Sequence, residues 1–356
     1  MRHSAIRLEH GSGGGPGVQA FAPGRVNLIG EHTDYNDGLC LPFAIELGVT
    51  VTAKPLRGRE IEAHALDLSQ QDRFELGPEI AQPPPGWRCF VRGAAAGLAA
   101  EGVELRPCRL DIAGDLPQGA GLSSSAALTV SLCLALCAVA GVEPPGPLAL
   151  ARLCSRVEND WCGAETGLLD QLAALCGKRG HAVRIDMRGP ELRLVPLALE
   201  GHLLATLDSG ASRSLSGSAY NERRQECRAA CRELGVDSLR DARGHAALPE
   251  PLGRRVRHVL TENERVDAMV AALEAGDAAE VGRLLDASHR SLRDDYEVSV
   301  PQVEDAVEAC RRAGALGARI VGGGFGGSVL ALFGVAAELP PGAVRVEPGP
   351  AARLLA

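Results

Sequence analysis

The longest apolar run of the chain, LTVSLCLALCAVAGV at residues 128–142, constrains the fold more than any other segment. It contains Ser131 and falls short of the roughly 18 to 20 apolar residues that a membrane-spanning helix needs. A helix that is apolar on all sides has to be surrounded by other elements. We therefore predict a buried helix here and no membrane partner.

Length and composition predict a two-lobed globular protein. A chain of 356 residues exceeds one comfortable hydrophobic core, so two packed lobes are expected. Hydrophobic residues make up 46% and charged residues 23%, which allows a large core and argues against a disordered chain. Strand-like and helix-like segments alternate without a regular βαβ period, and this favours an α+β arrangement over a doubly wound sheet.

Local patterns place the elements and a lobe boundary. β-branched side chains favour a strand at 47–53, and we expect residues 60–65 to be its hairpin partner. A turn at 188–190 predicts an N-terminal lobe at 1–188, with a flexible lead-in at 1–18, and a C-terminal lobe at 189–356. We expect further helices at 87–100, 148–161 and 167–176, and strands at 109–113, 181–187, 203–207 and in a pair within 318–333.

The net charge argues against some classes of partner, and the cysteines indicate a cellular compartment. The formal net charge of −8 offers no broad positive field, so we expect no nucleic-acid partner. The first residues, MRHSAIRLEHGSGGGPG, lack the apolar core of a signal peptide. Eleven cysteines without CxxC spacing predict free thiols in a reducing cytoplasm. The pairs Cys133/Cys137 and Cys227/Cys231 have helical spacing and are interpreted as sharing a helix face.

A glycine and serine cluster, GDLPQGAGLSSSAAL at 114–128, precedes the apolar run. Gly119 and Gly121 allow close backbone approach, and three hydroxyls follow at Ser123–Ser125. The free N–H groups and the dipole of a helix N-terminus favour negative charge, so the pattern predicts a phosphate site. A serine that only caps the helix is the alternative. The cluster is not a Walker loop, because no GKS or GKT follows the glycines.

Two further clusters indicate a ligand site. GGGFGGS at 322–328 superficially resembles a dinucleotide fingerprint, but strand-like VLALF follows it, so we interpret it as a tight turn near a ligand or a loop. ENDWCGAETGLLDQL at 158–172 carries Glu158 and Asp170 on either side of two glycines. If the chain turns there, one carboxylate can hold a metal and the other can accept a proton. Without further context, two surface carboxylates are the simpler interpretation.

A fourth stretch, GRVNLIGEHTDYNDGLCLP at 24–42, allows a family to be named. It resembles the signature of galactokinases in the GHMP small-molecule kinase family. GLSSSAAL resembles the phosphate loop of that family, and ARIVGGGFGGSVLALF resembles its C-terminal motif. The similarity extends from Phe21 to Phe333.

The resemblance implies a fold and an activity. The expected fold has an N-terminal lobe like ribosomal protein S5 and a ferredoxin-like C-terminal lobe, with the active site between them. The expected reaction is ATP-dependent phosphorylation of the anomeric hydroxyl of D-galactose, which yields galactose 1-phosphate and ADP and uses Mg²⁺. We expect a cytoplasmic monomer.

The resemblance also assigns roles to matching positions. Asp170 is the expected general base, with Arg25 beside it. Glu31, His32, Asp34 and Tyr220 are expected to bind the sugar. The expected nucleotide contacts are Gly119, Ala120, Gly121, Leu122, Ser123, Ser124 and Ser125, with Trp87 as a looser match in the adenine pocket. The expected ligands of Mg²⁺ are Ser125 and Glu158.

One departure from the family pattern keeps alternatives open. DSGASRSLSGSAYN at 208–221 replaces a stretch that is more often rich in threonine or asparagine and has a histidine before its leucine. This leaves a kinase for arabinose, N-acetylgalactosamine or a uronic acid as an alternative. A non-catalytic sugar sensor is a second alternative, because the resemblance extends to relatives that act as regulators. The presence of Arg25, Ser123–Ser125, Glu158 and Asp170 argues against the sensor.

Overall fold

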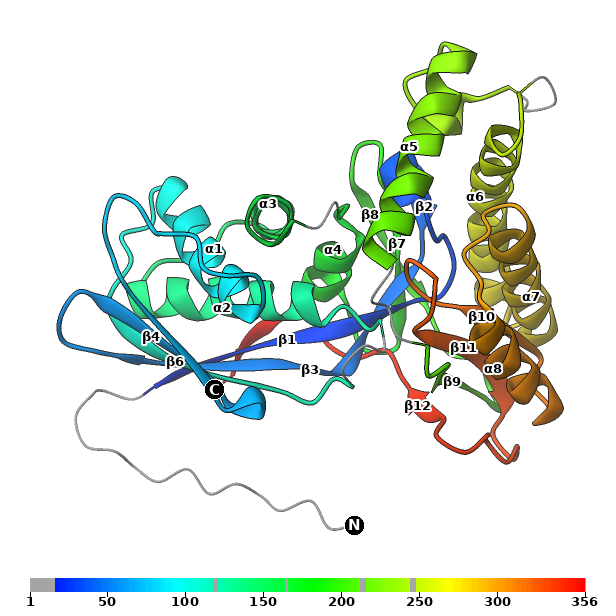
Figure 1. The fold of residues 1–356 in the computed structure, drawn as a ribbon. Helices are drawn as coiled ribbons and strands as arrows, with labels where there is room; N and C mark the ends of the chain where they lie inside the picture. The colour runs from blue at the N-terminus through cyan, green and yellow to red at the C-terminus, as the bar shows by residue number, and fades with distance from the viewer. Residues whose placement is uncertain (1–16, 118–120, 164–165, 212–215, 244–247, 356) are drawn as a thin grey trace.

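The computed structural model describes residues 17–117, 121–163, 166–211, 216–243 and 248–355 (Figure 1). The helices are α1 (Trp87–Ala100), α2 (Ser124–Ala140), α3 (Pro147–Arg156), α4 (Leu169–Cys176), α5 (Ser216–Leu234), α6 (Leu252–Ala275), α7 (Ala278–Asp294) and α8 (Pro301–Arg312). The strands are β1 (Val18–Asn27), β2 (Leu39–Cys40), β3 (Pro42–Pro55), β4 (Glu60–Ala65), β5 (Gln70–Glu75), β6 (Cys108–Gly114), β7 (His181–Asp186), β8 (Glu191–Pro196), β9 (His202–Asp208), β10 (Gly317–Ile320), β11 (Ser328–Gly334), β12 (Val344–Val346) and β13 (Arg353–Leu355).

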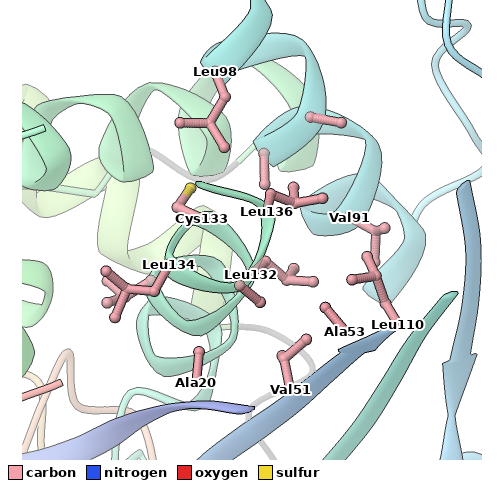
Figure 2. Close-up of a cluster of buried hydrophobic side chains, with 14 of the residues drawn as sticks. Ala20, Val51, Ala53, Val91, Leu98, Leu110, Leu132, Cys133, Leu134 and Leu136 are labelled. Carbon is pink, nitrogen blue, oxygen red and sulfur yellow. The ribbon is translucent and has the colours of Figure 1, made fainter. Parts of the chain in front are cut away.

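The first sheet has the order β13-β1-β3-β6-β4-β5, and α2 packs across β1 and β3 beneath α1. Figure 2 shows Leu132, Leu134 and Leu136 of α2 among side chains of the sheet and of α1. Most residues of α2 are buried, so the predicted buried helix is confirmed. None of the described helices combines the length and the apolarity needed to cross a membrane.

The predicted hairpin between 47–53 and 60–65 is wrong. β4 pairs antiparallel with β5 and parallel with β6, and β6 separates β4 from β3. The physical reason lies in β6, whose inward-facing Cys108, Leu110 and Ile112 are buried and therefore need a central position in the sheet. The crossover through β5 and α1 then places β6 beside β4.

The remaining strands form two smaller sheets. One has the order β10-β11-β9-β12, with α7 and α8 packed on it, and the other is β2-β7-β8, against which α6 packs. The predicted lobe boundary near 188 falls in the turn of the β7-β8 hairpin, and β13 pairs with β1 although it ends the chain. The division into 1–188 and 189–356 stays a prediction.

The end of β1 lies where these layers meet. Val26, Leu28 and Ile29 pack in one buried cluster with Val266 of α6 and Leu330 of β11. The register of β1 against β3 shifts between Pro23 and Arg25. The segment that follows β1 therefore leaves the first sheet directly against the helices and strands of the second half of the chain.

Candidate active site

A cavity of about 380 Å³ gathers the four sequence clusters. Its lining includes Arg25, Glu31, His32 and Asp34 from the stretch 24–42, Gly121–Ser125 from 114–128, Gly163, Thr166, Gly167, Leu169 and Asp170 from 158–172, Gly322–Gly324 from 322–328, and Tyr220 and Asn221 of α5. Segments almost 300 residues apart thus share one concave site. Gly119 and Ala120 lie outside the described residues.

Asp170 is held by contacts to both of its carboxylate oxygens. The Arg25 guanidinium donates from Nε to Oδ1 at 2.8 Å, and the Ser123 hydroxyl donates to Oδ2. Arg25 also donates from Nη1 to the Gly121 carbonyl at 2.8 Å and from its backbone N–H to the Leu122 carbonyl at 3.0 Å. One arginine therefore fixes both the carboxylate and the loop that precedes α2.

The N-terminus of α2 opens toward the cavity. Gly121 and Ser123 adopt positive φ angles of 74° and 60°, which turn the chain sharply before Ser124 begins the helix. The Ser123 side chain makes no capping hydrogen bond to the helix, since its hydroxyl is committed to Asp170. The simple serine-cap alternative is therefore wrong, and the first N–H groups of α2 remain available for an anion.

The Glu31 carboxylate is held by Arg319 of β10 and by Gly322, which follows this strand. Its Oε1 accepts from the Gly322 N–H at 2.7 Å and forms an ion pair with Arg319 Nη2 at 3.1 Å. The fully buried Arg319 also donates from Nη1 to the carbonyls of Asn27 and Leu28 at 3.0 and 2.9 Å. No hydrogen bond to Glu31 Oε2 occurs within the described part of the chain, so this oxygen can serve a ligand.

Helix α6 holds the backbone on either side of Glu31. Glu262 accepts from the Gly30 N–H at 3.0 Å and from the Ser288 hydroxyl at 2.7 Å, and His258 Nε2 lies 3.1 Å from the Glu31 carbonyl. Burial raises the pKa of Glu262, but Arg265, His258, Arg319 and the Ser288 hydrogen bond together outweigh it, and the net pKa is about 2. The loop after β1 is thus anchored to a permanent buried charge.

His32 sits among aromatic rings. Its φ of 60° brings the imidazole to ring-centroid distances of 4.6 Å from Tyr296, 5.4 Å from Tyr220 and 5.9 Å from Tyr35. Burial, and then the nearby His258 and Arg223, lower the pKa of His32 well below its ordinary value. The ring is therefore neutral and can donate one hydrogen bond and accept another.

Comparison with known proteins identifies the family. The chain is 43% identical over 329 residues to a galactokinase of Roseiflexus sp., covering 89% of this chain and 83% of that one. A Streptomyces coelicolor galactokinase is 42% identical, with coverage of 87% and 83%. This chain belongs to the galactokinase family. Family models agree: a galactokinase galactose-binding signature matches residues 9–55, the N-terminal domain of GHMP kinases matches 89–178, and the C-terminal domain matches 269–340.

Solved structures agree with the predicted GHMP kinase fold. A Lactococcus lactis galactokinase, crystallised in complex with galactose, superposes with a TM-score of 0.87 at 31% identity and 95% coverage of both chains. A Methanococcus jannaschii mevalonate kinase shares the fold, with a TM-score of 0.70 at 17% identity, and covers 94% of this chain and 99% of its own. The expected α+β GHMP fold is thereby confirmed.

Asp34 occupies a tight position in this galactokinase-family site. Burial, and then the charge of Asp170, raise its pKa to about 6. Gly167 lies so close to Asp34 that a Cβ at Gly167 would collide with the Asp34 carboxylate oxygen Oδ2. The glycine therefore makes room for Asp34. Burial, and then Asp34, raise the pKa of Tyr220 well above its ordinary value, so its phenol keeps its proton.

Glu158 is buried on a π-helical turn, Val157–Trp161, and is not part of the cavity lining. Its Oε1 accepts a hydrogen bond of 3.0 Å from Nε2 of Gln171, the residue that follows Asp170. Burial, and then the charge of Asp170, raise the pKa of Glu158 to about 8. A second carboxylate in a buried site is a position that a bound cation stabilises.

The donor set fits magnesium better than a transition metal. No group of three or more His, Cys, Asp or Glu side chains that could hold an ion occurs among the residues with described positions. Mg²⁺ needs few protein ligands, because substrate phosphates and waters complete its shell. Glu158 and the hydroxyl of Ser125, which lines the cavity, match that requirement.

Some residues differ from expectation or were missed. Trp87 is not part of the cavity lining, and its Nε1 donates to Gln70 Oε1 at 2.8 Å, so its adenine role stays a prediction. Glu262, His258 and Arg319 escaped the sequence analysis. A polar or charged residue in a helix or strand is usually solvated, and no local pattern distinguished these three.

Proposed function

We propose that this protein is a galactokinase, which transfers the γ-phosphoryl group of ATP to the anomeric hydroxyl of D-galactose. The products are galactose 1-phosphate and ADP. The observation that carries the proposal is the contact of Asp170 with both Arg25 and Ser123, at the N-terminus of α2 and in the same cavity as Glu31. A base, an arginine and an anion site are thus combined within reach of one bound sugar.

Asp170 serves as the general base in this proposal. The anomeric oxygen forms a bond to the γ-phosphorus, the bond from that phosphorus to the β–γ bridging oxygen breaks, and the hydroxyl proton passes to Asp170. Arg25 orients the carboxylate and stabilises the charge on the transferred group. Since both oxygens of Asp170 are hydrogen-bonded, the carboxylate is positioned before the substrate arrives.

Glu31, His32, Asp34 and Tyr220 bind the sugar hydroxyls. A hydroxyl donates one hydrogen bond and accepts others, so carboxylates and an imidazole on one short loop can each engage it. A missing or inverted hydroxyl would leave a buried polar group without its partner, and this discriminates strongly between sugars.

The nucleotide phosphates bind at Gly121–Ser125 in this proposal, where the helix dipole and the first N–H groups of α2 favour negative charge. Ser125 and Glu158 hold Mg²⁺, which when bound neutralises phosphate charge. The positive φ of Gly121 allows the close backbone approach that a phosphate needs. Trp87 is retained as a proposed contact of the adenine ring.

We also propose a cytoplasmic monomer with lobes at 1–188 and 189–356. All eleven cysteines are free thiols, which is typical of a reducing compartment. Size-exclusion chromatography with light scattering measures the mass of the particle in solution directly.

A coupled ADP-release assay tests the activity. ATP, Mg²⁺ and purified protein are incubated with galactose, arabinose, N-acetylgalactosamine and galacturonic acid in parallel. We expect turnover with galactose and a 1-phosphate product by NMR. Turnover with another sugar only would replace galactose as the substrate, and thermal protection by galactose without any turnover would favour the sugar sensor.

A matched pair of variants tests the base. Asp170→Asn is expected to lose at least about 10²-fold in kcat, since general base catalysis typically contributes that much or more. Galactose should still raise its melting temperature. Asp267→Asn is the control, because this carboxylate is exposed, pairs with Arg184 and does not line the cavity. Full activity of Asp170→Asn would contradict the proposed role.

A further inference from the structure

A buried hydrogen-bonded chain runs from His32 away from the cavity and includes three residues without a role in the reaction described above. His32 Nδ1 lies 2.8 Å from the Tyr35 hydroxyl, which lies 3.0 Å from the Tyr296 hydroxyl, which in turn lies 2.9 Å from Cys227 Sγ. Tyr296 is fully buried and Cys227 nearly so. We refer to His32, Tyr35, Tyr296 and Cys227 as the relay chain.

With all three hydrogen bonds formed, such a chain has four orientations, because each hydroxyl or thiol has one hydrogen to donate, and only one of the four leaves no hydrogen unused. Asn36 decides between them. Its Nδ2 donates to the His32 carbonyl at 2.9 Å and to Cys227 Sγ at 3.7 Å, so the sulfur already accepts a hydrogen. Were Tyr296 also to donate to the sulfur, the S–H group would need another acceptor, and no hydrogen bond within the described residues supplies one.

The opposite orientation uses every hydrogen. The Cys227 thiol donates to the Tyr296 oxygen, Tyr296 donates to the Tyr35 oxygen, and Tyr35 donates to His32 Nδ1. A buried polar network is stable when every member is satisfied, and its bonds polarise one another. The orientation is thus set at the far end of the relay chain, at the thiol.

This orientation determines which nitrogen of His32 carries the hydrogen. The burial of His32 keeps the ring neutral, so an accepting Nδ1 requires the hydrogen on Nε2. Nε2 is buried at the cavity and makes no hydrogen bond of good geometry to a described residue, although the Gly323 backbone acts on His32 as an acceptor that raises its pKa. A buried N–H without a well-aligned acceptor is costly unless a ligand supplies one.

We propose that Cys227, Tyr296 and Tyr35 are positioning residues that fix His32 as the Nε2–H tautomer, so that His32 donates a hydrogen bond to a hydroxyl oxygen of the sugar. The sugar assignment rests on the proposed function, whereas the tautomer does not. Glu31 and Asp34 accept hydrogens from hydroxyls. With a donor on His32 next to these carboxylates, one sugar hydroxyl can donate its hydrogen to a carboxylate and accept a hydrogen from His32. Only a hydroxyl with the correct orientation on the sugar ring can make both hydrogen bonds.

Nitrogen NMR of histidine-labelled protein reads the tautomer directly. The chain has nine histidines, and the signals of His32 are assigned by their loss in His32→Gln. We expect Nε2 to resonate as a protonated ring nitrogen and Nδ1 as an unprotonated one. A protonated Nδ1 in the wild-type protein overturns the proposal, whether or not any sugar is turned over.

Three variants test the direction of the relay chain. Tyr35→Phe removes the donor to Nδ1 and should abolish the single tautomer. Cys227→Ala should shift the population toward Nδ1–H, and Cys227→Ser, which retains a donor, should restore the wild-type pattern. Cys108→Ala is the control, because it removes an equally buried thiol from the separate core cluster of the first sheet, which contains no member of the relay chain. An unchanged tautomer in folded Tyr35→Phe refutes the relay chain.

Kinetics separate the positioning role from a merely structural one. Tyr35→Phe should raise KM for galactose about 2- to 10-fold, the effect of one hydrogen bond of about 0.5–1.5 kcal/mol, with kcat unchanged. Cys227→Ser should have a lower KM than Cys227→Ala. Unchanged KM in Tyr35→Phe alongside a disturbed tautomer would refute the contact to the sugar. Absence of turnover in the wild-type protein, with the expected tautomer, would refute the proposed function but not the relay chain.

Discussion

Replacing Arg319 by methionine should destabilise the protein strongly, because it removes the cation beside the buried Glu31 carboxylate. Arg319 is fully buried, and its Nη2 lies 3.1 Å from Glu31 Oε1. Methionine keeps the apolar stem and loses the charge and the donors to the carbonyls of Asn27 and Leu28. Breaking a buried ion pair by removing one partner costs about 3–5 kcal/mol.

A loss of that size is a large part of the ~5–15 kcal/mol that stabilises a typical domain. We expect the urea midpoint of Arg319→Met to fall well below that of the wild-type protein. Unfolding is followed both by circular dichroism and by tryptophan fluorescence. Trp87 and Trp161 report on α1 and the π-helical turn, so coincident curves show whether the whole chain unfolds together.

A double-mutant cycle isolates the ion pair. Glu31→Gln and Arg319→Met together remove both charges, so the double variant should be more stable than the sum of the single losses predicts by about 0.5–3 kcal/mol. Arg345→Met is the control, since its exposed pair with Glu347 should matter by less than about 0.5 kcal/mol. Equal midpoints for Arg319→Met and Arg345→Met, or strict additivity in the cycle, would refute the reasoning.

Three other predictions concern the carboxylates of the site. The pKa of Glu158 is raised to about 8, so the folded protein holds this proton more tightly than the unfolded chain does, and stability is lost as pH rises from the ordinary glutamate value toward 8. Glu158→Gln should flatten this part of the pH profile and raise the melting temperature above pH 8 without Mg²⁺; a profile identical to wild type would argue against a buried protonated Glu158. The pKa of Asp34 is about 6, so KM for galactose should rise as pH falls below 6, and Asp34→Asn should have a higher KM that no longer changes there. Gly167→Ala should raise that KM by about tenfold or more by displacing the charged Asp34, whereas Gly189→Ala, which has open space around it, should not; equal KM values would contradict the steric argument.

Local features of the fold were predictable from the sequence. The apolar run at 128–142 has no polar face, so a buried helix was the only stable outcome, and α2 occupies that position. Strand pairing was harder to predict. The predicted partner of β4 was wrong because β6, more than 40 residues further along the chain, lies between β3 and β4. No local sequence pattern indicates such an insertion.

For the site, too, the sequence indicated individual residues but not the contacts between them. Motifs brought Arg25, Ser123 and Asp170 to attention, but their mutual contacts bridge 145 and 47 residues of chain and follow only from the packed fold. Arg319 and Glu262 looked like ordinary charged residues of a strand and a helix. Their importance arises from complete burial, which depends on elements that lie far away in the sequence.

The pairing of β13 with β1 has a consequence for how the chain is synthesised. Leu355 lies opposite Gln19, and the Arg353 guanidinium lies 4.9 Å from the centre of the Phe21 ring. The first sheet thus joins β1 to a strand that is synthesised after the strands of the other two sheets. Until the residues of β13 emerge from the ribosome, this edge of β1 remains open to pairing with another nascent chain, so completion of the other strands of the first sheet does not by itself protect it.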